Sequence, residues 1–312
     1  MTRISVTTAS RSVVGLSLLI GLLAVSFSSI FIEWSKAPAA IIGMYRLWMS
    51  VILFMPMAWN KRRELVALSR KDIGLVLLSG LFLGLHFLFW IQSLKETSVA
   101  SSMIIISLEP IFVLIGSIIV FREGASRKAV FSMGLAVFGC VVVASGDMTR
   151  GSGHLWGDLL SLIGTVAVSV YMIAGQKLRK SVSGTTYNVL VFFVAGLVLF
   201  LFNIGTRSPL FGYSGQDWLM FALLAVVSTV LGHGIFNWLL SSVAATTVSM
   251  TILGEPVGAI VLAFFLLGQP ILLLQALGGA ICLIGVFAFL RLNHSGKSND
   301  EEYPPGEKTQ PA

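Results

Sequence analysis

The chain has 312 residues, of which 56% are hydrophobic and only 11% are charged, and its mean hydropathy is +0.90. Soluble domains carry roughly 25% charged residues, so this composition excludes an ordinary soluble protein and indicates a polytopic membrane protein. The formal net charge of +7 comes from basic residues between apolar segments, which we interpret as topology signals rather than as a nucleic-acid-binding surface.

Ten apolar segments are long enough to cross a bilayer as helices, which requires about 20 residues each. The first is preceded by Arg3 and Arg11, as in a signal peptide, but its apolar run continues to Ile32. We therefore expect a membrane span there rather than a cleaved leader. The predicted spans are 13–32, 39–58, 73–93, 98–120, 129–146, 157–176, 185–203, 218–240, 243–267 and 272–291.

Lysine and arginine are distributed unevenly between the two sides of the membrane. With the N-terminus in the cytoplasm, the inside segments hold sixteen of them and the outside segments hold four. Because basic residues accumulate on the cytoplasmic side, both termini are predicted to be cytoplasmic. We expect residues 1–12 to form a cytoplasmic N-terminus and the polar residues 292–312 to form a disordered cytoplasmic tail.

The two halves of the chain resemble each other. The segment Gly84-LHFLFW-Ile91 parallels Leu231-GHGIFN-Trp238 at an offset of 147 residues. Further along, Glu109-Pro110 parallels Glu255-Pro256 at an offset of 146 residues. The same order of histidine, aromatic residue and Glu-Pro step in both halves indicates an internal duplication.

This duplication predicts two repeats of five spans each, 13–146 and 157–291, joined by a loop at 147–156. Because five is an odd number, the second repeat must enter the membrane from the opposite side. The expected fold is therefore an all-α membrane protein with ten helices in a 5+5 inverted-topology repeat around a central cavity. This architecture is common among secondary transporters, whose substrate site lies at the midplane between the repeats.

Each repeat carries its Glu-Pro step in the middle of its fourth span. Proline has no amide hydrogen, so Pro110 leaves the carbonyl of Ile106 without its helical donor, and Pro256 does the same to Ile252. An ionised carboxylate at this depth is costly and needs a partner, water or a proton. We expect a hinged gate or a substrate-responsive site beside one cavity; the alternative is a pair of structural acids. The residues concerned are Glu109, Pro110, Glu255 and Pro256.

Other polar and aromatic side chains recur at helical spacing in several spans and would line a central cavity if those spans surround it. Each type also has a structural explanation: hydroxyls bond back to their own helix, histidines are satisfied by packing, and tryptophans are often core residues. The additional candidates for the cavity or its gates are His86, His233, Trp90, Asn237, Trp238, Tyr171, Ser102 and Thr251.

Arg46 lies inside the second predicted span. A buried arginine needs a carboxylate or carbonyl partner, and Glu33 and Glu123 are the candidates for a structural ion pair. A substrate anchor is the alternative interpretation of this residue.

Spans 5 and 10 lack polar stripes and are rich in glycine, which permits close packing within the fold or between two copies, although one copy is sufficient. Each also holds one cysteine, Cys140 and Cys282, without CxxC spacing. We expect both to be buried free thiols, and we expect no metal site and no cofactor.

The chain resembles the drug/metabolite transporter (DMT) superfamily, in its EamA-domain branch, over nearly all of 13–291. The residues that carry this resemblance are Leu108-Glu109-Pro110-Ile-Phe with Phe121-Arg122-Glu123, and Gly254-Glu255-Pro256-Val-Gly with Leu267-Gly268-Gln269. In this family a glutamate closes each of spans 4 and 9; Glu123 matches this pattern and Gln269 departs from it. The resemblance implies a central cavity, alternating access, and small organic solutes that are often moved outward, with spans 5 and 10 away from the cavity.

We therefore expect a secondary transporter in the plasma membrane, the inner membrane of a bacterium, with amino-acid or metabolite efflux as the first hypothesis. The expected partners are a small-molecule substrate and the lipid bilayer, with protons as a candidate coupling ion. The alternatives are a multidrug or nucleotide-linked metabolite carrier, a channel, or an intramembrane lipid enzyme. The sequence has no HExxH or GxSxG motif, and we do not expect an enzyme.

Overall fold

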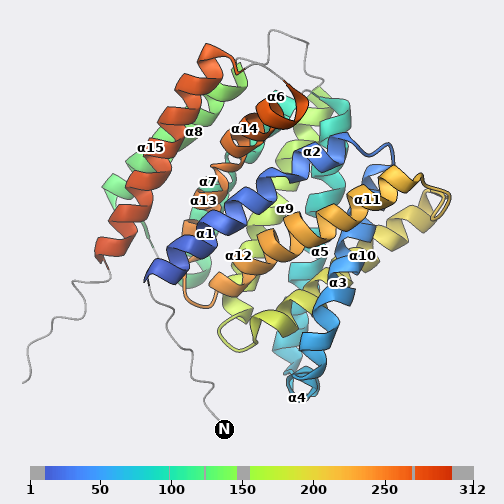
Figure 1. The fold of residues 1–312 in the computed structure, drawn as a ribbon. Coiled ribbons are helices and arrows are strands. Elements are labelled where there is room, and N and C mark those ends of the chain that lie inside the picture. Colours follow the sequence, from blue (N-terminus) through green and yellow to red (C-terminus); the bar gives the residue numbers. More distant parts are fainter. Residues whose placement is uncertain (1–10, 98, 123, 146–154, 269–270, 297–312) are drawn as a thin grey trace, which may run out of the picture.

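The computed structural model describes residues 11–97, 99–122, 124–145, 155–268 and 271–296, and every regular element in these ranges is helical (Figure 1). The elements of the first half are α1 (Arg11–Ser26), α2 (Ser28–Glu33), α3 (Ala39–Trp59), α4 (Arg62–Val66), α5 (Arg70–Glu96), α6 (Val99–Ile106), α7 (Glu109–Phe121) and α8 (Arg127–Ser145). Those of the second half are α9 (Leu155–Leu178), α10 (Gly184–Gly205), α11 (Gly215–Leu223), η2 (Leu224–His233), α12 (Gly234–Leu239), α13 (Ala245–Ile252), α14 (Glu255–Leu267) and α15 (Leu273–Gly296).

Eight helical segments of the described residues are long and apolar enough to cross a membrane. The predicted spans 98–120 and 129–146 are not among these eight; they correspond in the structure to α6 with α7 and to α8. The structure therefore supports eight to ten spans in an all-helical membrane protein. At the C-terminal end, α15 continues to Gly296, beyond the expected start of the tail at 292, and residues 297–312 lie outside the described ranges.

The two Glu-Pro steps break their helices at corresponding places. In the first repeat α6 ends at Ile106 and α7 begins at Glu109; in the second, α13 ends at Ile252 and α14 begins at Glu255. Proline is tolerated in the first turn of a helix, where an amide donor is not needed. The predicted interruption after each of these two isoleucines is thus confirmed, and each proline begins a new helix instead of kinking a continuous one.

The two new helices also end alike. After α7, Arg122 adopts a left-handed conformation with φ of 59°, and after α14 Gly268 does so with φ of 64°. These positions are 146 residues apart, the same offset as the Glu-Pro steps. Glycine takes this conformation readily, whereas arginine does so against a steric preference.

Helices α8 and α15 pack against each other along one edge of the molecule (Figure 1, green and red). A Cβ on Gly139 would lie 2.3 Å from the backbone nitrogen of Cys282, and one on Gly285 would lie 2.5 Å from that of Ala136. The contact is reciprocal, because Gly139 and Gly285, and likewise Ala136 and Cys282, are 146 residues apart. The expected close packing of these glycine-rich helices therefore takes place within the fold.

Replacing Gly139 by alanine is expected to lower the unfolding temperature of the purified protein. The new methyl group would meet backbone atoms of α15 that cannot turn aside, and overpacking of this kind costs about 1–3 kcal/mol, or roughly 2–10 °C. Gly134→Ala is the matched control in the same helix, because a Cβ at Gly134 would meet no atom within 4 Å. Equal destabilisation by both changes, measured by thermal unfolding in detergent, would argue against this packing.

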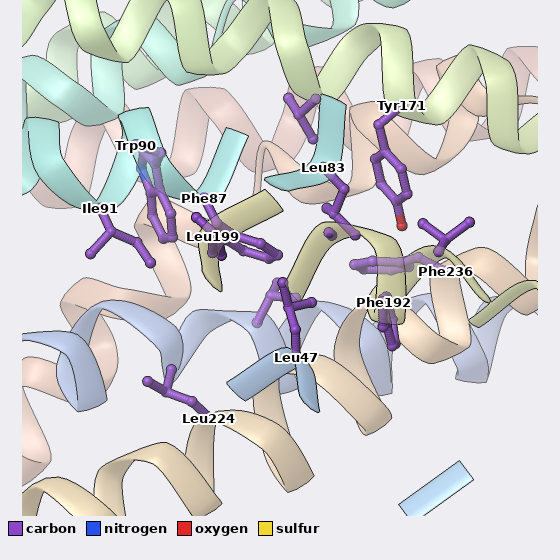
Figure 2. Close-up of a cluster of buried hydrophobic side chains, with 14 of the residues drawn as sticks. Leu47, Leu83, Phe87, Trp90, Ile91, Tyr171, Phe192, Leu199, Leu224 and Phe236 are labelled. Atoms are coloured by element: carbon purple, nitrogen blue, oxygen red, sulfur yellow. The ribbon is translucent and has the colours of Figure 1, made fainter. Parts of the chain in front are cut away.

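The centre of the molecule is an apolar cluster that joins both repeats. Figure 2 shows Phe87 and Trp90 of α5 together with Leu47 of α3, Tyr171 of α9 and Phe236 of α12. Each of these side chains is at most 4% exposed. Polar side chains at the same depth therefore lie in an environment from which water is largely excluded, where each needs a partner.

Candidate functional site

The two Glu-Pro steps lie together although they are far apart in the sequence. Their four residues line one void of about 10 Å³ between the broken helices α6–α7 and α13–α14. A void of this size holds no more than about one water molecule. The other residues that line it are Met103, Ile106, Ser107, Ser249, Ile252 and Leu253.

The two glutamates differ in burial. Glu109 is 4% exposed, and its Oε1 has no hydrogen-bond partner among the residues that the structure describes. Glu255 is half-buried, and its negative charge acts on Glu109. Two carboxylates that repel each other in an apolar interior need a compensating cation or proton.

Arg46 supplies one positive charge at this depth. Its side chain is fully buried; Nε donates to Thr229 Oγ1 at 3.0 Å and Nη1 donates to Ser28 Oγ at 3.3 Å. The guanidinium carbon lies 4.2 Å from the centre of the Phe87 ring, an arrangement that stabilises a cation. The remaining nitrogen, Nη2, has no hydrogen-bond partner within the described part of the chain.

The carboxylate that acts on Arg46 is Glu255, from the opposite repeat. The sequence suggests Glu33 or Glu123 instead. Glu33 is exposed at the end of α2, and Glu123 lies outside the described residues. The negative charge that acts on Arg46 therefore comes from one of the two Glu-Pro glutamates, 209 positions away in the chain, and not from Glu33.

Arg46 is held by an irregular stretch of helix. Its acceptor Thr229 lies in η2, a π-helical segment, and donates to the carbonyl of Leu224 five residues earlier, at 2.9 Å. The hydroxyl of Ser50, one turn along α3, donates to the carbonyl of Ala225 at 3.2 Å. π-Helical turns often occur at functional sites because they turn side chains and carbonyls toward new partners.

The two predicted histidines lie near this arginine, and its charge acts on both. His86 Nδ1 lies 3.0 Å from the carbonyl oxygen of Gly164, and its ring stacks on that of Trp90. His233 contacts the ring of Phe87, with ring centres 5.4 Å apart. The indole Nε1 of Trp90 is buried and has no partner in the described ranges.

A second polar network joins α9, α10 and α12. The Tyr171 hydroxyl donates to Asn237 Oδ1, and Asn237 Nδ2 donates to Asn188 Oδ1 at 2.8 Å. Asn188 Nδ2 in turn donates to the carbonyl of Gly234 at 3.3 Å. The charge of Glu109 acts on Tyr171, so this network adjoins the glutamates. Tyr171 and Asn237 are thus near the site. Asn188, a lone amide in an apolar span, is a further member of this network that is not among the candidates from the sequence.

Three other candidates have different surroundings. Ser102 is buried between Ser93 and Ser161, with oxygen–oxygen distances of 2.8 and 3.2 Å, and joins three helices. The Thr251 hydroxyl donates to Thr247 O at 3.0 Å, within its own helix. Trp238 is 42% exposed, so the structure does not bring its side chain into the buried cluster.

The two thiols lie at the second helix break. Cys140 Sγ and Cys282 Sγ are 3.4 Å apart, and they donate to the carbonyl of Leu253 at 3.6 and 3.2 Å respectively. Both are free and buried, as the sequence predicts. They satisfy a carbonyl that has left the regular helix between α13 and α14.

The structure therefore places one arginine, two glutamates and two histidines in the interior of an apolar helical bundle, next to paired helix breaks. Ionisable groups in the membrane interior mark solute and ion pathways, and discontinuous helices are typical of carriers. These features define a multi-pass membrane transporter.

The profile of the EamA-like transporter family matches residues 12–145 and again 155–291, so the chain belongs to this family of the DMT superfamily. Members of this family are transporters, and the chain is not an enzyme.

Several similar proteins are also named as transporters. An "Uncharacterized transporter" of Archaeoglobus fulgidus is 26% identical over 229 residues, which is 71% of this chain and 79% of the relative. "Uncharacterized transporter YetK" of Bacillus subtilis is 25% identical over 309 residues, which is 96% of this chain and 89% of the relative. One solved crystal structure aligns with a TM-score of 0.77 at 16% identity, covering 92% of this chain and 100% of that chain, which supports the fold alone.

Proposed function

We propose that this transporter carries a small zwitterionic solute, with an amino acid as the first candidate, out of the cell across the bacterial plasma membrane. The observation that carries this proposal is a pair of buried atoms, one on a cationic group and the other on a carboxyl group. Arg46 Nη2 and Glu109 Oε1 each have no partner among the described residues. A solute carboxylate would accept a hydrogen bond from Nη2, and a solute ammonium would donate one to Oε1.

The charges of the cluster favour a solute with a cationic group. Arg46 supplies one positive charge, whereas Glu109 and Glu255 supply two negative charges when both are ionised. The balance is restored by the ammonium group of a solute or by a proton on one carboxylate. Competition between these two cations at Glu109 would couple solute export to proton entry.

Alternating access would use the two helix breaks as hinges. The breaks lie at corresponding positions of the two repeats and line a common void, as expected for an inverted repeat with both termini in the cytoplasm. Bending at one break and then at the other would expose the same central site to each side in turn. A multidrug or nucleotide-linked metabolite carrier is the alternative, and it would not require both charged groups of the solute.

Uptake by the purified protein in liposomes tests this proposal. We expect saturable transport of at least one amino acid from a mixed panel. A pH gradient that drives protons in the direction opposite to the solute should accelerate it. An excess of the corresponding amide, which lacks the carboxylate, or of the N-acetylated form, which lacks the ammonium, should compete poorly. Folded protein that shows no saturable flux, or that either analogue inhibits as strongly as the amino acid itself does, would contradict a zwitterion-selective site.

A further inference from the structure

Two of the candidate membrane spans, Arg70–Glu96 and Gly215–Leu239, begin with the same capping arrangement. At the start of α5, Asp72 Oδ2 accepts hydrogen bonds from the backbone nitrogen of Ser69 at 3.1 Å and from its hydroxyl at 2.6 Å. At the start of α11, Asp217 Oδ2 accepts the same two bonds from Ser214, at 3.2 and 2.6 Å. Both are capping boxes, which satisfy the free amides at a helix start.

The other oxygen of each carboxylate reaches a different part of the fold. Asp72 Oδ1 accepts from the Ser181 hydroxyl at 3.1 Å, in the connection between α9 and α10. Asp217 Oδ1 accepts from the Ser35 hydroxyl at 2.8 Å, in the connection between α2 and α3. The two aspartates are 145 residues apart and the two serines 146 residues apart. Corresponding elements of the two repeats are therefore joined by the same link. The capping boxes themselves use Ser69 and Ser214 and do not require Ser181 or Ser35.

The two links lie at opposite ends of the bundle. Asp72 is near the first residue of α5, and Lys95 is near the last, which separates them by about 35 Å at 1.5 Å per residue. Lys95 Nζ donates to the carbonyl of Ala37 at 2.5 Å, only two residues from Ser35. The distance between the two ends is comparable with the hydrocarbon thickness of a bilayer, about 30 Å. One link thus belongs to each face of the membrane.

The two links are not equally strong. Asp217 and Ser35 are 5% and 6% exposed, and Asp217 Oδ1 also accepts from the backbone nitrogen of Lys36 at 2.8 Å. Gln216 adds a bond to the carbonyl of Trp34 at 3.0 Å. The Asp72–Ser181 bond is longer, and Ser181 is exposed. Water competes with an exposed hydrogen bond and not with a buried one, so the Asp217 link is the firmer of the two.

We propose that Asp72–Ser181 and Asp217–Ser35 are a pair of latches, one at each membrane face, that open alternately during the transport cycle. Each aspartate holds a loop of the fold against the start of a spanning helix, and release of that bond lets its face open. This inference rests on the proposed alternating access. It assigns gating roles to four residues that contribute nothing to the solute site itself.

The experiment compares which face of the protein exposes the centre. Ser249 lines the void between the Glu-Pro breaks, and Ser249→Cys serves as the reporter for a membrane-impermeant maleimide added to either side of sealed vesicles. Labelling of the chain without this reporter, which retains Cys140 and Cys282, is subtracted. We expect Ser35→Ala to increase labelling from the Asp217 face about fivefold, the population change for one ordinary hydrogen bond. Ser181→Ala should increase labelling from the Asp72 face, by a smaller factor.

The chain supplies matched controls for both latches. Ser214→Ala and Ser69→Ala remove the capping hydroxyls and leave the latch serines in place, so they should lower thermal stability without shifting labelling toward one face. Ser35→Thr keeps the hydroxyl and should restore the original labelling. No change in labelling from either latch variant, or a change toward the same face from both, would overturn the proposal.

This readout is independent of the solute. Labelling of the reporter needs no substrate, so opposite shifts in a protein that transports no amino acid would support the latches and contradict only the proposed substrate. Saturable amino-acid transport with unchanged labelling would support the proposed substrate and contradict the latches. If Ser35→Ala protein does not fold, the comparison of Ser181→Ala with Ser69→Ala still decides whether the latch bond controls opening at the Asp72 face.

Discussion

Replacement of Arg46 by glutamine is expected to reduce amino-acid transport in liposomes at least about 30-fold at low solute concentration. This corresponds to about 2 kcal/mol, the lower range for removal of one partner of a buried, hydrogen-bonded charge pair. The reason is that Nη2 of Arg46 is a buried donor without an acceptor among the residues that the structure describes, and glutamine offers no charge to a solute carboxylate. Initial rates measured over a range of solute concentrations should show the loss mainly as an increased KM.

The same substitution also removes the positive charge that acts on Glu255, so folding must be separated from transport. The double variant Arg46→Gln/Glu255→Gln removes both charges together and should recover the folded yield. If Arg46 anchors the solute, this double variant remains inactive. Recovery of transport in the double variant would instead make Arg46 a structural partner of Glu255.

Replacement of Pro110 by alanine is expected to lower the transport rate at least about tenfold while leaving thermal stability unchanged or higher, as expected for loss of a hinge. Alanine restores an amide hydrogen that can bond to the carbonyl of Ile106, which would join α6 and α7 into one helix. The same change at Pro256 should join α13 and α14. The measurements are initial transport rates at saturating solute and thermal unfolding in detergent.

Pro56 provides the matched control for these two variants. It lies inside α3, which continues through it from Ala39 to Trp59, so Pro56→Ala removes a proline without closing a helix break. We expect this variant to transport at the original rate. If the Pro110→Ala variant and the Pro256→Ala variant both transport at the original rate, the breaks are not hinges.

The features that the sequence predicts correctly depend on local chemistry. Proline lacks an amide hydrogen wherever it occurs, so Pro110 and Pro256 predict that the carbonyls of Ile106 and Ile252 lose their helical donors, at the residues where α6 and α13 end. The break itself needs more than a proline, because α3 continues through Pro56. The hydrophobic spans follow from composition, and the internal duplication follows from similar residues that recur at a nearly constant offset along the chain.

The features that the sequence does not reveal depend on contacts between distant segments. The charge of Glu255 acts on Arg46 although the two residues lie 209 positions apart in the chain, and no spacing rule indicates this. In the π-helical segment η2, the carbonyls of Leu224 and Ala225 accept hydroxyl bonds from Thr229 and Ser50, and the second of these comes from a distant helix. Trp238 is a candidate from the sequence because it is an aromatic residue within a predicted span, but its side chain is 42% exposed. A serine and an acid three residues apart predict a helix cap, but not which distant loop the second carboxylate oxygen will bind.

The small void between the Glu-Pro breaks also bears on how the cell keeps its membrane energised. Because this void holds no more than about one water molecule, it leaves no room between the breaks for a file of waters along which protons could hop. A carrier that rests with its centre packed in this way can be present at high abundance without discharging the proton gradient. Under the proposed alternating access, permeation then requires the helices around the void to separate, so the barrier is open only during the transport cycle.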